Sequence, residues 1–389
     1  MPKTPGATPP LLRDLNERTV LEAIRAGAPI SRAQISRRSG ISKPTVSLAL
    51  QSLLEAMLVR EAAERPDGPG YGALYFEPVP DAALVLGLDV GARFVRGAVC
   101  DLAGAIRARQ DVELPVAVVP EAVAAIERLR SSLFEASGLE PDRVDGVVVG
   151  VPGVVESETG VLRLAENVAG LEGRAFADEL QSALGLPVTL ENDINLAALG
   201  EHWQGVAQGV DDFVFLSIGT GMGAGVVLRG ELHRGRHGAA GEIDFALVGV
   251  DETVDPSAPQ VAELAAELSG RRTDARAVFR AARNGDDSAR AVVEEIARRI
   301  ALHVAPVAAV ADVELVVLGG GIGANGDLLL DPVSRLLGDW LPFPPRVEIS
   351  TLGEAAVLTG ALAVGLQAAL ENVFARRPSL AAESVSGLS

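Results

Sequence analysis

Apolar residues recur at helical spacing in three short segments at the start of the chain, and glycine-containing turns separate them. The first segment covers residues 11–26, the second follows Ser31, and the third follows Ser42 with Pro44 in its first turn. A serine before a helix and a proline in its first turn are typical signals of a helix N-terminus. The pattern therefore predicts three helices, of which the second and third form a helix-turn-helix.

Two short runs of strand character follow, over residues 59–63 and 73–78. They flank residues 64–72, where glycine and proline predict a turn. A strand pair directly after the third helix is typical of a wing. We therefore predict a winged helix-turn-helix domain over residues 11–80.

From residue 81 onwards, strand-like apolar runs alternate with helical patterns. Strands are expected over residues 83–90, 93–100, 144–151, 187–190, 213–218, 224–229, 313–319 and 345–350, and helices over residues 121–136, 175–184, 261–270, 275–284 and 288–310. The segments 86–91 and 215–221 are similar strand-and-turn units. The alternation predicts an α/β fold of two duplicated lobes with a cleft between them.

Length and composition restrict the class of protein. With 389 residues, 48% of them hydrophobic, the chain is long enough for two or three domains with large cores. Its start lacks an apolar signal core, and its most apolar late segment, residues 301–321, is interrupted by charged residues and a proline, so export and a membrane span are not expected. The single cysteine, Cys100, excludes an intrachain disulfide and fits the reducing cytoplasm.

The charge is distributed unevenly. The chain carries −18 overall, but residues 1–80 hold 10 Lys and Arg against 8 Asp and Glu, which leaves −20 for the rest. A cationic face on an acidic protein can approach phosphate locally. Contacts to bases or phosphates are expected from the third helix, phosphate contacts from the second helix, and a minor-groove contact from the wing. These candidates are Ser42, Lys43, Thr45, Ser47 and Gln51, then Arg32, Arg37 and Arg38, with Arg65 reaching a minor groove. The alternative is a small protein-binding adaptor.

A second group of candidates lies where the strand at residues 187–190 leads into a helix. Asn192 and Asp193 fall in its first turn, followed downstream by the glycine-rich segment 217–225 and by Glu242. A carboxylate at this position can simply cap the helix. It can also act as a base toward a substrate hydroxyl during phosphoryl transfer.

Six motifs in this order resemble the ROK family of repressors, open reading frames and sugar kinases, and specifically its repressor branch. The motifs occupy residues 89–91, 149–155, 191–195, 217–225, 235–243 and 318–323. The resemblance implies an actin-like ATPase fold, sugar bound between the lobes, and dimers. It also implies that Asn192 holds sugar hydroxyls, that Asp193 corresponds to the kinase base, that Gly153 backs the sugar and that Glu242 accepts from two hydroxyls. The N-terminal lobe would then cover residues 81–199, completed by a helix over 353–372, the C-terminal lobe would cover 200–352 with ligand-binding and oligomerisation surfaces, and 1–10 and 373–389 would be loose tails.

The departures from the kinase pattern are informative. Arg93 and Phe94 replace a small hydroxyl residue and a basic residue in the first phosphate loop, and a phosphate cradle needs close backbone approach. The zinc-binding histidine and cysteines of the family are absent from residues 241–256. These departures from the family pattern lead us to expect no cofactor, no metal and no kinase activity, with Asp193 as a vestigial base.

These observations lead to a hypothesis of a cytoplasmic transcription regulator, a repressor that binds a palindromic operator as a homodimer or homotetramer and responds to a sugar or sugar phosphate. Two alternatives remain open. One is an ATP-dependent sugar kinase with an accessory DNA-binding domain. The other is a repressor that responds to a protein and binds no ligand.

Overall fold

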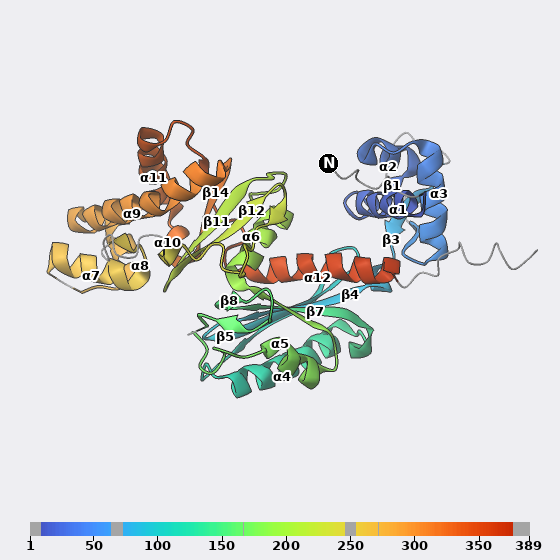
Figure 1. Ribbon diagram of the computed structural model, residues 1–389, viewed down its shortest axis with the longest axis horizontal. Coiled ribbons are helices and arrows are strands. Elements are labelled where there is room, and N and C mark those ends of the chain that lie inside the picture. The colour runs from blue at the N-terminus through green and yellow to red at the C-terminus, as the bar shows by residue number, and fades with distance from the viewer. Residues whose placement is uncertain (1–8, 64–72, 166, 246–253, 271, 376–389) are drawn as a thin grey trace, which may run out of the picture.

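The computed structural model describes residues 9–63, 73–165, 167–245, 254–270 and 272–375 (Figure 1). The N-terminal domain consists of α1 (Pro9–Arg25), β1 (Ile30–Ser31), α2 (Arg32–Ser39), α3 (Lys43–Glu55), β2 (Val59–Glu61) and β3 (Tyr75–Pro78). The strands pair in the order β1-β3-β2, and α1 begins two residues before the predicted start. The predicted helix-turn-helix is confirmed, whereas the wing turn with Arg65 lies outside the described residues.

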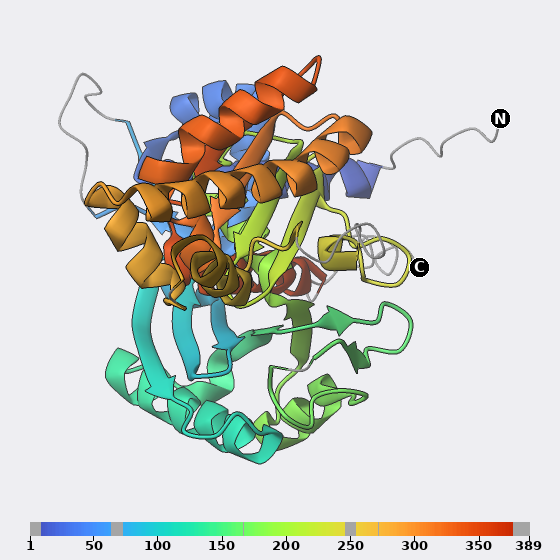
Figure 2. The ribbon, with the colours of Figure 1, turned by 90° about the vertical axis from the view of Figure 1, so that its left-hand side faces the viewer.

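The N-lobe, residues 84–192, is a five-stranded sheet with helices on one face (Figure 2). Its elements are β4 (Leu84–Val90), β5 (Phe94–Asp101), β6 (Ile106–Glu113), α4 (Val119–Ser137), β7 (Val144–Val151), β8 (Val154–Val155), β9 (Leu162–Arg163), α5 (Phe176–Leu184) and β10 (Val188–Asn192). Side chains of β4, β7 and α4 form one buried apolar cluster.

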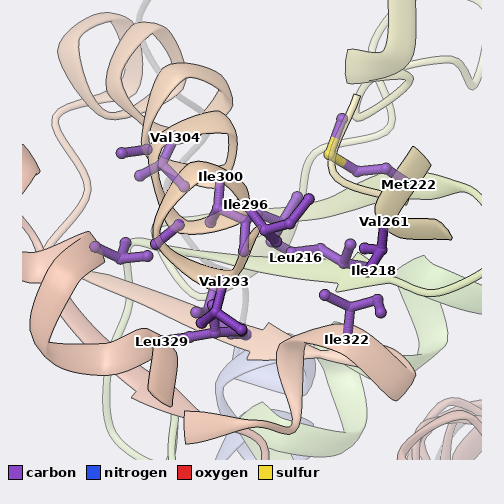
Figure 3. Close-up of a cluster of buried hydrophobic side chains, with 14 of the residues drawn as sticks. Leu216, Ile218, Met222, Val261, Val293, Ile296, Ile300, Val304, Ile322 and Leu329 are labelled. Carbon is purple, nitrogen blue, oxygen red and sulfur yellow. The ribbon is translucent and has the colours of Figure 1, made fainter. Parts of the chain in front are cut away.

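The helix α6 (Asp193–Gln204) leads into the C-lobe, residues 213–349. The C-lobe contains β11 (Phe213–Ile218), β12 (Met222–Leu228), β13 (Glu231–Leu232), α7 (Ala258–Ser269), α8 (Ala275–Arg283), α9 (Asp287–Ala311), β14 (Leu315–Gly319), α10 (Gly320–Gly323), α11 (Gly326–Trp340) and β15 (Arg346–Ile349). Leu216 and Ile218 of its sheet pack against Ile296 and Ile300 of α9 and Leu329 of α11 (Figure 3).

The two sheets have the same strand order. The N-lobe sheet runs β6-β5-β4-β7-β10 and the C-lobe sheet β13-β12-β11-β14-β15. In each lobe a meander of three antiparallel strands is extended by two parallel strands. The predicted duplication of a β/α unit is therefore confirmed.

Several elements escaped the sequence pattern, and β6 and α11 are the longest of them. The strand β6 is an edge strand that alternates charged and small residues and is largely exposed, which is a common way to protect a sheet edge. The helix α11 contains Pro332 in its interior, which the pattern treats as a helix breaker.

The final helix, α12 (Ala356–Ala375), packs between α6 and the N-lobe sheet. Glycines make this approach possible: a Cβ on Gly360 would lie 1.8 Å from the Leu196 carbonyl oxygen, and one on Gly200 would lie 2.3 Å from that of Ala356. The stretch 353–374 is the one described helical segment long and apolar enough to cross a membrane. Its glycine-mediated contacts identify it as a core helix.

The N-terminal domain shares a core with the N-lobe and α12. Its own buried residues, such as Ile24 and Leu50, belong to one apolar cluster with Cys100 of β5 and Leu362 and Phe374 of α12. In Figure 1 the domain lies beside one end of α12. The DNA-binding region is therefore packed onto the N-lobe and α12 through side chains.

Candidate functional site

The third helix presents the predicted base-reading residues at its N-terminal end. The Ser42 side chain is the N-cap and accepts from the Thr45 backbone N–H at 3.4 Å, and the two hydroxyls lie 2.8 Å apart. Lys43 and Gln51 are exposed, and the Gln51 amide donates to Glu55 at 3.0 Å. These polar groups form one outward surface on α3.

The arginines of α2 flank this surface. Arg32 donates to the Ser47 hydroxyl at 3.0 Å, and Ser47 donates to the Lys43 carbonyl at 2.9 Å, so Arg32 joins α2 to α3. Arg37 and Arg38 are exposed in the last turn of α2. The arrangement suits a helix in the major groove with cations toward the phosphates.

The second group of candidates meets where β10 ends and α6 begins. Asn192, not Asp193, is the N-cap, because its side chain accepts from the Asn195 N–H at 2.9 Å. The Asn192 amide also donates to the Gly153 carbonyl at 2.9 Å. Gly153 has φ of 92°, and a Cβ there would lie 2.5 Å from the Arg163 carbonyl oxygen, so only glycine fits.

Asp193 is enclosed by protein while keeping partial contact with solvent. Desolvation, followed by the charge of Asp89, raises the pKa of Asp193 to about 7. Desolvation also raises the pKa of Asp89 to about 6, against the opposing effect of Arg96. Carboxyl groups whose pKa values are raised in this way provide acceptors and, when protonated, donors for a polyol.

Glu242 approaches this pair from the C-lobe. Its charge is among the causes that raise the pKa of Asp193, and its own pKa is raised by desolvation and by Asp244. The preceding Gly241 accepts at its carbonyl from the Ala224 N–H at 2.8 Å, and a Cβ on Gly241 would lie 1.8 Å from the Ala224 oxygen. The tight contact fixes Glu242 relative to β12.

Two polar networks around these residues were not predicted. Glu191, only 6% exposed, accepts from Asn195, from the Asn192 N–H and from Arg234, the last at 2.7 Å. Arg96 donates to Asp89 at 3.1 Å and to Glu354 at 3.2 Å. No sequence signal links partners that lie 43 or 258 residues apart.

The two glycine-containing hairpin turns differ in what fills them. At the β4–β5 turn, the Gly91 N–H donates to the Phe94 carbonyl at 3.0 Å, and the guanidinium groups of Arg93 and Arg96 lie 5.6 and 5.5 Å from the Phe94 ring centre. At the β11–β12 turn, added Cβ atoms on Gly219 and Gly221 would meet nothing within 4 Å. The first turn is filled with side chains and the second is open.

The later glycines of the second hairpin serve packing. Cβ atoms on Gly223 and Gly225 would lie 2.5 and 2.7 Å from side chains of Ile194 and Ala198, so α6 packs directly on β12.

No group of three His, Cys, Asp or Glu residues suited to a metal occurs within the part of the chain that the structure describes. His233 and His237 are exposed. Residues 246–253 of the segment considered for zinc lie outside the described residues.

A winged helix-turn-helix that precedes two duplicated lobes and packs onto the first of them, with acceptor side chains where the lobes meet, defines a class: DNA-binding regulators built on a sugar-kinase scaffold. The ROK family model matches residues 85–368, and a model for winged helix-turn-helix DNA-binding domains matches residues 13–56. The chain therefore belongs to the ROK family, and it is a transcriptional regulator with a DNA-binding helix-turn-helix.

Similar proteins include both regulators and kinases. A xylose repressor of Caldicellulosiruptor bescii is 25% identical over 387 residues, covering 91% of this chain and 96% of the repressor. A glucokinase of Halalkalibacterium halodurans is 31% identical over 311 residues, covering 71% of this chain and 92% of the kinase. The alignment with the xylose repressor is therefore long enough to include part of the DNA-binding region as well as the lobes.

Solved structures confirm the fold. The crystal structure of a ROK family transcriptional regulator, a homologue of the E. coli MLC protein, aligns with a TM-score of 0.76 at 23% identity, covering 94% of this chain and 98% of that chain. A ROK family glucokinase from Streptomyces griseus in complex with glucose and AMPPNP aligns with a TM-score of 0.62 at 28% identity, covering 73% of this chain and 100% of that chain.

Proposed function

We propose that this regulator is a cytoplasmic repressor that binds a palindromic operator as a homodimer or homotetramer and responds to a sugar or sugar phosphate. The ligand binds between the lobes, where Gly153, Asn192, Asp193 and Glu242 contact its hydroxyl groups. Binding alters lobe closure and thereby the spacing of the paired α3 helices. A ligand shifts such an equilibrium only when it binds the two states unequally, and a coupling of about 1 to 3 kcal/mol is sufficient.

The observation that carries the proposal is the position of α6. Its N-terminal end holds Asn192 and Asp193, and near its other end Trp203 packs against the core that the DNA-binding domain shares with the N-lobe and α12. The Trp203 ring and the Arg25 guanidinium both lie next to Gly104 in the β5–β6 turn, 3.3 and 4.0 Å from a Cβ added there. One helix therefore connects the ligand residues with α1.

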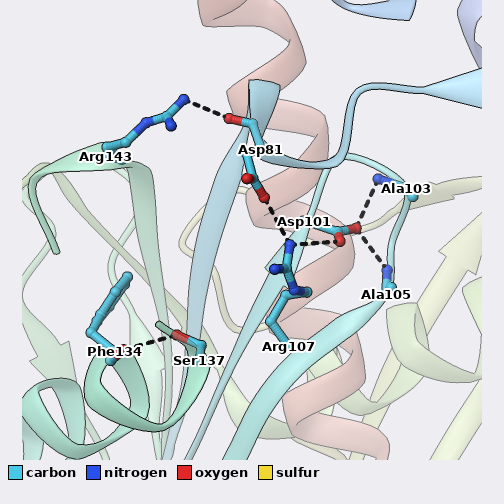
Figure 4. A network of polar contacts seen from close by, with 8 residues as sticks. All are labelled: Asp81, Asp101, Ala103, Ala105, Arg107, Phe134, Ser137 and Arg143. Atoms are coloured by element: carbon cyan, nitrogen blue, oxygen red, sulfur yellow. Dashed lines mark hydrogen bonds and ion pairs between the residues drawn. The ribbon is translucent and has the colours of Figure 1, made fainter. Parts of the chain in front are cut away.

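The β5–β6 turn, which lies next to both Trp203 and Arg25, is held rigidly. Asp101, only 2% exposed, accepts from the N–H groups of Ala103 and Ala105 at 3.0 and 3.1 Å, and Arg107 joins it to Asp81 (Figure 4). Arg25 of α1 donates to the Leu102 carbonyl in this turn at 2.7 Å. A displacement of α6 at Trp203 is therefore passed to α1 and not absorbed in the turn.

A mobility shift with fragments from upstream of sugar-metabolism genes tests the proposal. We expect retardation of at least one fragment and a change in its affinity with one member of a panel of sugars and sugar phosphates. The Asp193→Asn variant should retain DNA binding and lose that response. Retardation of no fragment contradicts operator binding, and an unchanged affinity with every ligand contradicts the sensor role.

Salt titration separates the two sets of DNA contacts. Lys43→Ala should relax sequence preference at one position, at a cost of about 1 to 3 kcal/mol on the preferred duplex. Arg37→Ala should weaken all duplexes alike and reduce the slope of log affinity against log salt by about 0.9. Equal effects of the two variants on preferred and random duplexes would contradict this division.

An ATP-dependent sugar kinase with an accessory DNA-binding domain is the second candidate. It is favoured by the open turn at Gly219 and Gly221 and by Asp193, whose raised pKa suits a base near neutral pH. Phosphorylation of any hexose in a panel, abolished by Asp193→Asn, would establish it.

The β4–β5 turn argues against this second candidate. Phosphate loops need backbone N–H groups that a phosphate can reach closely. Here the Gly91 N–H is bonded to the Phe94 carbonyl, and the guanidinium groups of Arg93 and Arg96 lie over the Phe94 ring. The residues present do not fit a nucleotide phosphate, and calorimetry with ATP should detect no binding.

A further inference from the structure

The outward face of α3 has an apolar centre. Val46, Ala49, Leu50 and Leu53 are buried on one side of this helix. The helical repeat then directs Leu48 to the opposite side, where it is 69% exposed. Pro44, Gln51 and Glu55 share that face by the same repeat, and all three are exposed.

The polar groups around Leu48 are already engaged with one another. The Ser47 hydroxyl is bonded to Arg32 and to the Lys43 carbonyl, and the Gln51 amide is bonded to Glu55. Leu48 forms no such bond and projects from the second turn of the helix. It is therefore the largest apolar group that the N-terminal half of α3 offers to a partner.

A singly exposed leucine is ordinary on a protein surface. Two observations indicate that DNA is the partner of Leu48. It lies on the helix that a helix-turn-helix inserts into the major groove, within the region matched by the DNA-binding model. Residues 31–54 around it contain four Lys or Arg residues, namely Arg32, Arg37, Arg38 and Lys43, and no acidic residue.

We propose that Leu48 reads thymine in the operator by packing against its 5-methyl group. The thymine methyl is the one apolar group on the base edges of the major groove, and apolar side chains recognise it there. A leucine cannot donate or accept a hydrogen bond, so it distinguishes thymine from cytosine by this methyl alone. The inference rests on the proposed binding to an operator.

The test uses the full-length protein and a duplex selected by it from a randomised pool. Each thymine of the selected half-site is replaced in turn by deoxyuridine, which removes only the 5-methyl group. At one position per half-site we expect the affinity of the unaltered protein to fall about fourfold, the factor that corresponds to one buried methyl group. Uridine at the remaining thymines should have no effect.

Variants identify the protein side of the contact. Leu48→Ala should lose about fourfold per half-site on the thymine duplex and show no further loss with uridine at that position. Leu48→Met, which keeps an apolar side chain of similar volume, should restore the discrimination. Leu15→Ala removes a leucine that is 50% exposed on α1, and this control should bind both duplexes like the unaltered protein. Circular dichroism confirms that each variant is folded.

The outcomes separate the inference from the function on which it rests. Failure to enrich any duplex overturns operator binding itself. Enrichment of a half-site without thymine, or equal affinity for thymine and uridine at every position, overturns the role of Leu48 alone. Equal discrimination by Leu48→Ala and the unaltered protein also overturns it, because the methyl is then read by another residue.

Discussion

The two ends of α6 contrast sharply in chemistry. The N-terminal end is polar: Asn192 caps it, and the pKa of Asp193 is raised by burial and by Asp89. Toward the C-terminal end, the buried Glu201 carboxylate accepts from the Val206 and Leu352 backbone N–H groups at 3.0 and 3.2 Å. One end keeps buried carboxyl groups that a ligand can engage, whereas the other has its charge satisfied within the protein.

This difference teaches how one helix can serve two purposes. Polar groups that are incompletely satisfied are costly, and such sites tend to be functional. A fully bonded end transmits displacement, because packed interfaces do not deform gradually. We therefore expect substitutions to affect stability, coupling or pH dependence according to the part of α6 that they touch.

The largest effect is expected from Gly360→Ala, which disturbs the packing of α12 against α6. The new methyl group would lie 1.8 Å from the Leu196 carbonyl oxygen, so α12 must move away from α6. A cost above about 3 kcal/mol in the free energy of unfolding is expected, as for severe overpacking. The control is Gly338→Ala in α11, where nothing lies within 4 Å and the change should be neutral or slightly stabilising in urea denaturation.

A smaller effect is expected from Arg25→Ala, which removes the contact between α1 and the β5–β6 turn. Its side chain is 9% exposed and donates to the Leu102 carbonyl. Loss of such a charged hydrogen bond should cost about 1.5 to 3 kcal/mol and weaken the effect of ligand on operator affinity. Arg290→Ala, which removes an exposed ion pair on α9, should leave both quantities unchanged. A full ligand response in Arg25→Ala would exclude this route of coupling.

A further prediction concerns pH and sharpens the description of the polar end. Between about pH 4 and 7, folded Asp193 holds a proton that the unfolded chain has released, since its pKa rises from 3.8 to about 7. The free energy of unfolding should therefore fall as pH rises through this window. Asp193→Asn removes that contribution, so the variant should gain stability relative to the parent at pH 8 compared with pH 4. Urea denaturation at both pH values measures it, and a difference independent of pH would contradict the buried carboxyl.

Much of the architecture was accessible from the sequence because strong periodicity fixes element type. The strands and helices that form the cores were predicted within a few residues, and so were the helix-turn-helix and the duplication of the lobes. The edge strand β6 was missed because it is rich in charged residues and none of its side chains is fully buried, so its apolar signal is weak. The helix α11 was missed because Pro332 interrupts its signal.

The site was only partly accessible, since it depends on contacts between distant segments. The motifs directed attention to Asn192, Asp193 and Glu242, but the capping role was assigned to Asp193 and belongs to Asn192. The bond from Arg234 to Glu191 cannot be deduced from local sequence, because the two residues lie 43 positions apart. The outward direction of Leu48 follows from the helical repeat, whereas its exposed fraction of 69% requires the structure.

The sole cysteine of the chain can report on the joint, the apolar core that the DNA-binding domain shares with the N-lobe and α12. Cys100 is completely buried in the core shared with the DNA-binding domain, and burial raises the pKa of its thiol to about 12. A thiolate does not form there while the domain is docked. Its modification by an aromatic disulfide reagent therefore requires the joint to open, and the labelling rate measures that opening in the native chain without any introduced probe.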